Sequence, residues 1–296
     1  MIDKILSEYR AGIDNIDEEI VKLLVDRVSI VKKVGEYKNR SGQKGSIIRP
    51  GREATMIKDI TAKFGDDSIP KAAVAQMWRI IISSCINIEE DTKIAVLSNK
   101  DYPECYWLSR EYFGAFSFMD KKATRTEVIH DLKEGRVTVG IIVLNDDESS
   151  DPWWSRITNN EDRPKIFAKL PFIQLEESKK PPIIALAFVE PENTGEDESI
   201  WVIKADEFIQ PTEIRNFLEN AGIEYNVIEE SRELSLITMH NYLIKITGFI
   251  TQDDKRIAKF LKDINEKYNS RPAPTEAYYL GSYAIPMTFS KGNKNA

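Results

Sequence analysis

Three of the cations in a helix-forming stretch near the start of the chain could bind a small acid. Arg10, Arg27 and Lys38 lie in a segment whose apolar residues recur at intervals of three and four, which is typical of a helix. Arg27 and Lys38 should lie about 20° apart around this helix and about 16 Å apart along it. Two long side chains at this spacing could close on one small acidic ligand. The alternative is a pair of ordinary surface cations, because the chain holds 41 lysines and arginines.

Arg10 is too far from Arg27 to join the same site easily within one chain. The expected separation is about 25 Å along the helix and about 100° around it. Arg10 could reach the site from an antiparallel second copy of the helix. The stretch IIRPGREATM, residues 47–56, adds further charged side chains, namely Arg49, Arg52 and Glu53. It is either a solvated loop and a helix start or part of a site for a small acid.

The elements that must position these residues are predicted to be three helices. The first extends from Ile2 to Lys38, about 55 Å, which is too long for a lone small domain and requires a partner along its length. Two glycines in NRSGQKGS end it. Pro50 suits the first turn of a second helix that continues to about Phe64, and a third helix covers Lys71 to about Glu90. One very long helix with two shorter ones favours a helical dimer.

The rest of the chain alternates between strands and helices. The composition changes at Thr92, and the alternation that follows predicts a small α/β lobe. After the acidic, turn-rich stretch EPENTGEDES, the order strand, helix, strand, strand, helix, strand (βαββαβ) predicts a ferredoxin-like domain. We therefore expect a multidomain chain with an all-α domain over residues 1–91, a small α/β lobe over 92–190 and a ferredoxin-like domain over 197–290.

Composition and charge exclude several classes of function. The net charge of −7 argues against a general nucleic-acid binder or an anionic-membrane binder. No apolar run approaches the roughly 20 residues needed to span a bilayer, and the N-terminus does not read as a secretory signal. The two cysteines, Cys85 and Cys105, form no disulfide framework, which indicates a reducing cytoplasm. The scattered histidines and cysteines lack metal-ligand spacing, so no metal site is expected.

Three motifs in the first ninety residues resemble those of the all-helical chorismate mutase domain. The resemblance covers roughly residues 3–90. Its Arg-x-x-Ile-x-x-Ile-Asp pattern begins at Arg10, its Val-Gly-x-x-Lys pattern ends at Lys38, and its Arg-Pro-x-Arg-Glu pattern spans 49–53. Together these motifs are specific. The resemblance implies a cytoplasmic homodimer that rearranges chorismate to prephenate without a cofactor, with the first helix of each subunit crossing into the pocket of the other.

The resemblance also implies a role for each candidate residue. Arg27 and a partner-chain Arg10 would bind the two carboxylates of chorismate, because arginine offers bidentate donors. Lys38 would donate to the ether oxygen, which gains negative charge in the transition state. Glu53 would accept a hydrogen bond from the ring hydroxyl, and Arg52 would shape the electrostatics of the pocket. Two further residues are expected on the substrate-binding side, Arg49 and Cys85.

Position 89 holds a glutamate where some members of this family carry a glutamine that donates to the ether oxygen. An ionised carboxylate cannot donate, so Glu89 would have to be protonated in the productive complex. Burial and the charges of the ligand would raise its pKa. The alternative is that Glu89, or Glu90 beside it, is a solvated helix end.

The remaining two hundred residues resemble prephenate dehydratase followed by its regulatory ACT domain. The stretch YYLGSYAIP is similar to the end of that ACT domain, with Ala284 where proline is usual. The departures are more informative, because the dehydratase's glycine-rich opening and its Thr-Arg-Phe motif are absent. The only Thr-Arg pair, Thr124–Arg125, is out of place. The segment between the linker-like stretches, about 95 residues, is also too short for the two lobes of an active dehydratase. The ACT-like part also lacks the usual Gly-Ala-Leu turn, so weak or absent phenylalanine binding is expected.

These resemblances predict a chorismate mutase of aromatic amino acid biosynthesis, fused to a degenerate dehydratase-like lobe and an ACT-like domain. One alternative is a bifunctional enzyme that still forms phenylpyruvate. Another, of a different class, is a non-catalytic protein that senses an aromatic amino acid.

Overall fold

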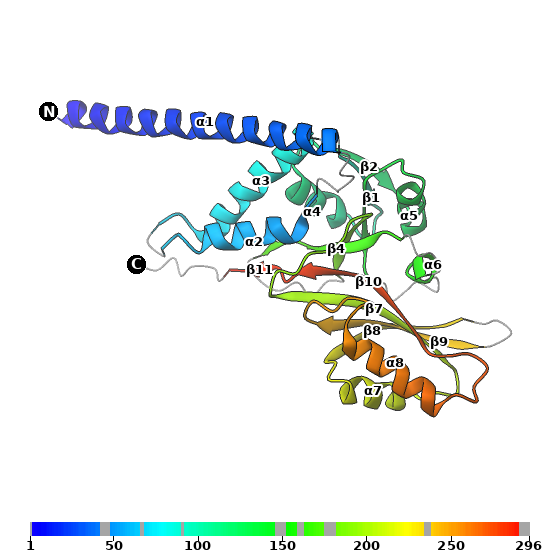
Figure 1. Ribbon diagram of the computed structural model, residues 1–296. Coiled ribbons are helices and arrows are strands. Elements are labelled where there is room, and N and C mark those ends of the chain that lie inside the picture. The colour runs from blue at the N-terminus through cyan, green and yellow to red at the C-terminus, as the bar shows by residue number, and fades with distance from the viewer. Residues whose placement is uncertain are drawn as a thin grey trace.

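The computed structural model describes residues 2–41, 48–65, 68–89, 92–145, 152–158, 163–174, 182–233 and 238–289. The predicted break at NRSGQKGS falls mainly outside these ranges, and so do Glu90 and the predicted boundary at residue 91. Three helices come first, and a region of strands and helices follows (Figure 1). This is the order that the sequence predicts.

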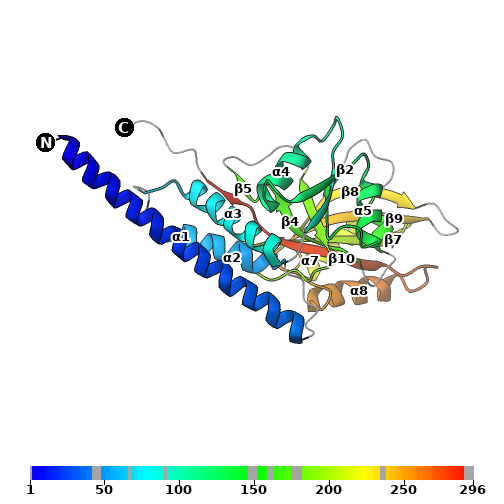
Figure 2. The same cartoon turned by 90° about the horizontal axis from the view of Figure 1, so that it is seen from above.

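Helix α1 (Ile2–Ser41) is 40 residues long and projects from the body of the protein (Figures 1 and 2). Many of its apolar side chains are exposed, including Tyr9 at 69% and Ile13 at 58%. A few residues in the second half of α1 are partly covered, and they recur at helical spacing. They are Arg27, Val28, Val31, Gly35 and Lys38. This covered face lies toward helix α3, and the rest of the apolar stripe is open to solvent.

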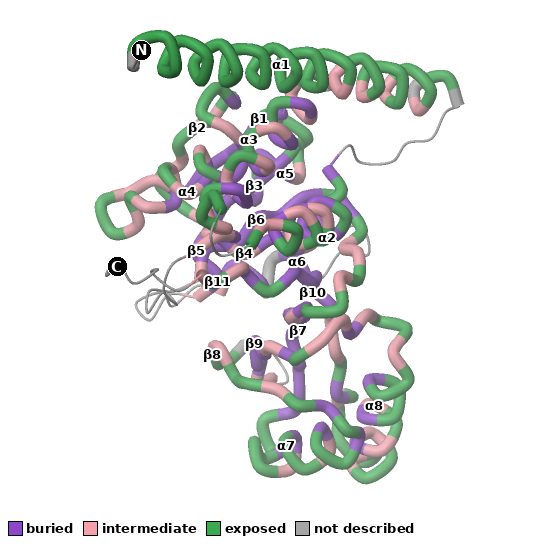
Figure 3. The backbone as a smooth tube through the Cα atoms, turned by 90° about the vertical axis from the view of Figure 1, so that its left-hand side faces the viewer, coloured by how far each residue is buried: buried purple, intermediate pink, exposed green. Residues whose placement is uncertain are grey.

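Helices α2 (Pro50–Thr61) and α3 (Lys71–Glu89) pack against each other, and α3 lies between α1 and α2 (Figures 1 and 3). Pro50 occupies the first turn of α2, where its missing N–H costs no intrahelical hydrogen bond. Ile57 of α2 and Val74 of α3 are completely buried. The two helices thus join α1 to the rest of the protein.

A nine-stranded sheet extends through the remainder of the chain, in the order β2-β1-β3-β6-β4-β10-β7-β9-β8. Its first half corresponds to the predicted α/β lobe. Strand β1 pairs in parallel with β2 and β3, whereas β6 is antiparallel to β3 and β4. The elements of this half are β1 (Lys93–Leu97), α4 (Glu104–Phe113), β2 (Phe118–Lys122), α5 (Arg125–Lys133), β3 (Val139–Val143), α6 (Ser155–Thr158), β4 (Lys165–Leu170), β5 (Ile173–Gln174) and β6 (Ile183–Ala187).

The second half of the sheet has the predicted βαββαβ order. Its strands pair antiparallel in the order β10-β7-β9-β8, and the buried faces of α7 and α8 share a core with Trp201 and Ile244. This is a ferredoxin-like arrangement. The elements are β7 (Asp197–Asp206), α7 (Pro211–Asn220), β8 (Tyr225–Glu233), β9 (Met239–Thr247), α8 (Lys255–Lys267) and β10 (Glu276–Ala284). A last strand, β11 (Met287–Thr288), pairs with β5.

The two halves of the sheet join where β10 and β4 pair at Gly281 and Ile166. A β-bulge lies between Tyr279 and Gly281, and the φ angle of Gly281 is +134°. A Cβ atom added at Gly281 would overlap the carbonyl oxygen and the amide nitrogen of Ile166. Only glycine permits this approach of two backbones. The sheet therefore continues across the predicted boundary between residues 190 and 197, and one hydrophobic core includes residues from both sides.

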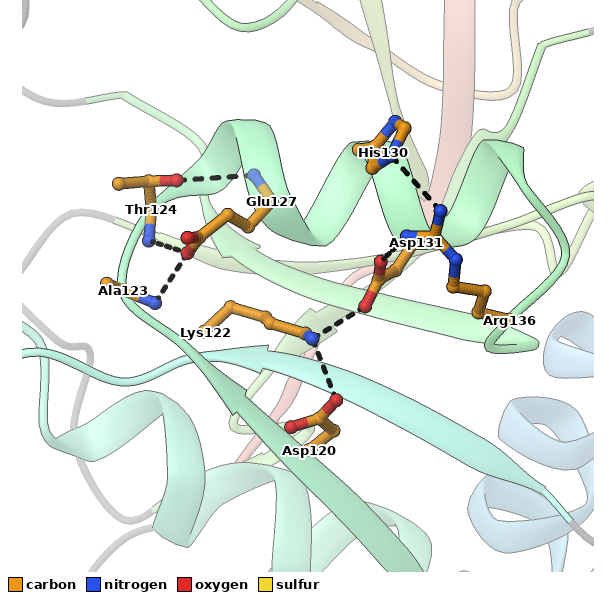
Figure 4. A network of polar contacts seen from close by, with 8 residues as sticks. All are labelled: Asp120, Lys122, Ala123, Thr124, Glu127, His130, Asp131 and Arg136. Atoms are coloured by element: carbon orange, nitrogen blue, oxygen red, sulfur yellow. Dashed lines mark hydrogen bonds and ion pairs between the residues drawn. The ribbon is translucent and has the colours of Figure 1, made fainter.

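A polar network joins the edge strand β2 to both ends of α5 (Figure 4). Lys122 lies 2.8 Å from Asp120 and 2.7 Å from Asp131, which also pairs with Arg136. The hydrogen bond from Lys122 lowers the pKa of Asp131. Thr124 caps α5, since its hydroxyl accepts from the Glu127 amide at 3.2 Å while the Glu127 carboxylate accepts from the Thr124 amide. The hydroxyl of the only Thr-Arg pair is therefore used to begin a helix.

The junction at Gly281 yields a first prediction. Gly281→Ala should lower the unfolding free energy by at least about 2 kcal/mol, because it adds both backbone strain and a clash with Ile166. Gly222→Ala is the matched control, since Gly222 also has a positive φ angle, of 75°, but nothing lies within 4 Å of its added Cβ. Urea unfolding measures both losses, and equal losses would contradict a steric role for the junction.

Candidate active site

The structure brings four of the eight predicted site residues together between α1 and the end of α3. The guanidinium of Arg27 donates a 2.6 Å hydrogen bond from Nη1 to Sγ of Cys85. The charges of Lys38 and Arg27 both act on the carboxyl of Glu89, one turn beyond Cys85. We call Arg27, Lys38, Cys85 and Glu89 the α1–α3 cluster.

Helical spacing explains how these residues meet. Arg27 and Lys38 belong to the covered face of α1, while Cys85 and Glu89 are four residues apart on α3 and so share one face of that helix. Gly35 lies next to Glu89, since a Cβ added there would be at van der Waals distance, 3.6 Å, from Cγ of Glu89. The glycine of the Val-Gly-x-x-Lys pattern is therefore adjacent to the glutamate.

Glu89 has the electrostatics of an acid that can hold a proton. Burial raises the pKa of its carboxyl, and the nearby charges of Lys38 and Arg27 oppose this rise. Its Oε2 atom is buried and has no hydrogen-bond partner among the described residues. When protonated, the carboxyl can donate a hydrogen bond. Two cations beside such a donor could bind an anion and stabilise negative charge on an adjacent oxygen.

The α2 residues of the predicted site lie elsewhere in this chain. The carboxylate of Glu53 is buried, lies 2.8 Å from Nη2 of Arg79 and accepts a 3.0 Å hydrogen bond from the Arg49 amide. The side chain of Arg49 pairs with Glu192, and Arg52 is exposed. The structure gives these three residues no contact with the α1–α3 cluster among the described interactions. Their roles toward a substrate remain predictions.

Arg10 also lies apart from the α1–α3 cluster. It is exposed on the projecting half of α1, about 25 Å along the helix from Arg27. A single chain therefore presents only part of the predicted set of cations at this site.

The sequence did not reveal the role of Arg79. Its side chain is almost completely buried, between Glu53 and the ring of Tyr112, whose centroid lies 4.3 Å from the guanidinium. Burial alone would lower the pKa of Arg79, but the facing Glu53 carboxylate raises it. A signal was available, because Arg79 is a charged residue on the buried face of α3 that also includes Val74, Ala75 and Ile82. A cation at such a position requires a buried partner.

The described residues form neither a metal-ligand cluster nor a membrane-spanning helix. No group of three or more histidine, cysteine, aspartate or glutamate side chains in this part of the chain is arranged to hold a metal ion. None of the described helices has both the length and the hydrophobicity needed to cross a bilayer.

Residues 9–90 match the family model described as chorismate mutase type II. The matched segment contains all eight candidate site residues, including the α1–α3 cluster. The helical region is homologous to type II chorismate mutase. We call residues 9–90 the mutase region from here on. The sequence-based recognition of this region is confirmed.

Curated relatives support the same recognition. The bifunctional chorismate mutase/prephenate dehydratase of Aquifex aeolicus is 29% identical over 140 residues, which cover 46% of this chain and 38% of that protein. The protein of the same description from Neisseria gonorrhoeae is 33% identical over 96 residues, 32% of this chain and 25% of that protein. The chain thus spans well under half the length of these curated relatives.

Among solved structures, the prephenate dehydratase from Streptococcus mutans superposes with a TM-score of 0.47 at 15% identity. The superposition covers 65% of this chain and 97% of that one.

Proposed function

We propose that the mutase region catalyses the rearrangement of chorismate to prephenate, a step of aromatic amino acid biosynthesis. The observation that carries this proposal is the α1–α3 cluster inside the segment that matches type II chorismate mutase. The reaction is a unimolecular rearrangement. It needs neither a nucleophile nor a cofactor, and the enzyme has to hold the substrate in its reactive conformer.

Each residue of the cluster has a distinct task in this proposal. Arg27 binds one carboxylate of chorismate through its planar guanidinium, which Cys85 orients before the substrate arrives. Lys38 and protonated Glu89 donate to the ether oxygen as it gains negative charge. Donors aimed at this oxygen stabilise the transition state more than the substrate, which is the condition for a faster reaction.

We propose that a second copy of the chain completes the site. The open apolar stripe of α1 supports this, because a helix with a wide exposed apolar face requires a partner. An antiparallel α1 would bring Arg10 of the second copy toward Arg27 and supply the cation for the second carboxylate. Apolar side chains on the outer face of α3, including Met77 and Ile80, are also exposed and would be covered in such a dimer.

We propose that the C-terminal region does not dehydrate prephenate. Thr124 of the only Thr-Arg pair caps α5, and one α/β lobe precedes the ferredoxin-like strands. The similarity to bifunctional chorismate mutase/prephenate dehydratases favours the alternative that dehydration is retained. We also propose that the ferredoxin-like part is ACT-like, because of its strand order and the stretch YYLGSYAIP.

One assay tests both the proposed mutase activity and the proposed lack of dehydratase activity. The full chain is incubated with chorismate, and phenylpyruvate is measured before and after acid, which converts any prephenate to phenylpyruvate. We expect chorismate to disappear and phenylpyruvate to form only after acidification. Phenylpyruvate formed at neutral pH at a comparable rate would establish the bifunctional alternative, and unchanged chorismate would remove the mutase proposal.

The raised pKa of Glu89 predicts how activity depends on pH. Only the protonated carboxyl can donate, so the competent fraction and kcat/KM should fall as pH rises through that pKa. Glu89→Gln supplies a permanent N–H donor of similar shape and should flatten the alkaline side of the profile. Glu89→Ala should lose activity at every pH, by about 10²-fold.

The profile is measured from about pH 5 to pH 9 for wild type and both variants, because a raised pKa moves the titration of a carboxyl above its usual range near 4. Superimposable profiles for wild type and Glu89→Gln would show that Glu89 does not supply the proton to the ether oxygen.

The shared site predicts complementation between two inactive variants. Arg10→Ala and Arg27→Ala should each be inactive, and mixing and refolding them together should restore about a quarter of wild-type activity. The reason is that half of the dimers would be mixed, and each mixed dimer would contain one intact pocket of two.

Each variant refolded alone is the control for the mixing itself. Lys22→Ala, which removes an exposed α1 cation outside the cluster, controls for loss of charge on the helix and should stay active. An active monomer in sedimentation velocity, or no gain of activity on mixing, would contradict the shared site.

A further inference from the structure

The first turn of α2 is held by a side chain that lies far beyond the mutase region. Glu192 belongs to the segment before β7, and its carboxylate contacts α2 at two residues. Oε1 accepts hydrogen bonds from the guanidinium of Arg49, at 2.8 Å from Nε and also from Nη2. Oε2 accepts a 3.1 Å hydrogen bond from the backbone amide of Arg52.

Helix α2 needs this contact because its own N-cap supplies none. The N-cap residue is Arg49, whose side chain makes no capping hydrogen bond, and Pro50 has no N–H. The Arg52 amide is one of the first-turn donors that lack an intrahelical acceptor. A carboxylate at this position satisfies that amide and also interacts favourably with the positive end of the helix dipole. Glu192 therefore performs the task of an N-cap residue from 140 residues away.

The fit at this contact is close. A Cβ added at Gly51 would lie 2.5 Å from Cβ of Glu192 and 2.8 Å from its carbonyl oxygen, so the segment rests directly on the glycine. A second pair, Lys58 with Glu196 at 2.9 Å, fixes the same segment further along α2. The carbonyl oxygen of Glu196 accepts a hydrogen bond from the Ile285 amide, just after β10. The start of α2 is thus joined to the ferredoxin-like strands.

We propose that Glu192 is a positioning residue for the mutase reaction, which caps α2 from outside the mutase region and thereby fixes Arg52 and Glu53. The kinetic part of this proposal rests on the proposed function, whereas the capping part does not. A chain cut after the mutase region would keep the residues of the α1–α3 cluster but not the cap. The ferredoxin-like region therefore contributes to the site through the backbone of α2 rather than through a contact with substrate.

The test uses the full chain with two readouts. Hydrogen exchange of the Arg52 amide reports the cap, and kcat and KM with chorismate report the site. Glu192→Ala should speed exchange of that amide about five- to tenfold, the change that loss of a helix cap produces. KM should rise more than kcat falls, because the exposed Arg52, in its predicted role in the electrostatics of the pocket, would act on the substrate complex as well as on the transition state. Glu192→Gln keeps one acceptor and should lie between wild type and Glu192→Ala.

Two further variants sharpen the result. Glu196→Ala removes the same charge from the same segment without touching the first turn of α2, so it should leave both readouts near wild type. Gly51→Ala should behave like Glu192→Ala because of its clash with Glu192, although alanine by itself favours a helix over glycine.

The outcomes separate the two proposals. Equal exchange in Glu192→Ala and Glu196→Ala would overturn the cap. Faster exchange with unchanged kcat and KM would reduce Glu192 to a structural cap and overturn the positioning role. A wild-type chain without mutase activity would defeat the proposed function, and the positioning role with it, while exchange would still decide the capping.

Discussion

The buried ion pair between Glu53 and Arg79 is the interaction on which the arrangement of the helical region depends. Both side chains are almost fully excluded from solvent, and the ring of Tyr112 covers the guanidinium from α4. A buried cation without its partner typically destabilises a protein by about 3–5 kcal/mol, a large part of the 5–15 kcal/mol that stabilises a domain. The pair therefore fixes α2 against α3 and both of them against the α/β lobe. Helix α3 can then present Cys85 and Glu89 on its other side to α1.

Helix α1 differs from α3, because most of its apolar side chains are exposed to solvent whereas most of those of α3 are at least partly buried. Its second half rests on α3, where Arg27 reaches Cys85, but the apolar side chains of its first half are open to solvent. Exposed apolar area of this extent is unfavourable by roughly 25 cal/mol per Å². The geometry that leaves α1 uncovered is also the geometry that leaves Arg10 far from Arg27. In the proposed dimer, a second α1 would both cover this apolar face and bring its own Arg10 toward Arg27.

Local patterns in the sequence were sufficient to predict the elements. Intervals of three and four gave α1 nearly to its ends, Pro50 gave the start of α2, and the strand and helix order gave the ferredoxin-like arrangement. These features depend on residues close together in the chain. Periodicity also placed Arg27 and Lys38 on one face of α1, where the structure has them. The members of the α1–α3 cluster could thus be predicted from the sequence, once the family resemblance had identified Cys85 and Glu89.

Contacts between distant segments could not be predicted in this way, because a local pattern carries no information about a partner far away in the chain. Glu192 lies in an acidic, turn-rich stretch that looks like a solvated linker, and nothing near it indicates a helix N-terminus as its partner. The continuous sheet depends on Gly281, whose lack of a side chain permits contact with Ile166, although glycine there is equally consistent with a turn. Arg79 was different, because its charge on a buried helix face indicated a buried partner, though not that the partner was Glu53. Sequence thus predicted each element better than the pairs that join them.

The electrostatics of the α1–α3 cluster link proton uptake to substrate binding in the proposed reaction. Without a ligand, Arg27 and Lys38 oppose the rise in the Glu89 pKa that burial causes. Chorismate would bring two carboxylates, which neutralise these cations and add negative charge near Glu89. Both effects disfavour an ionised Glu89, so its pKa should be higher in the complex than in the free protein. By reciprocity, a protonated Glu89 must favour binding of the dianion. A glutamate at position 89 therefore makes substrate binding and provision of the donor a single coupled event, which a glutamine at the same position would not require.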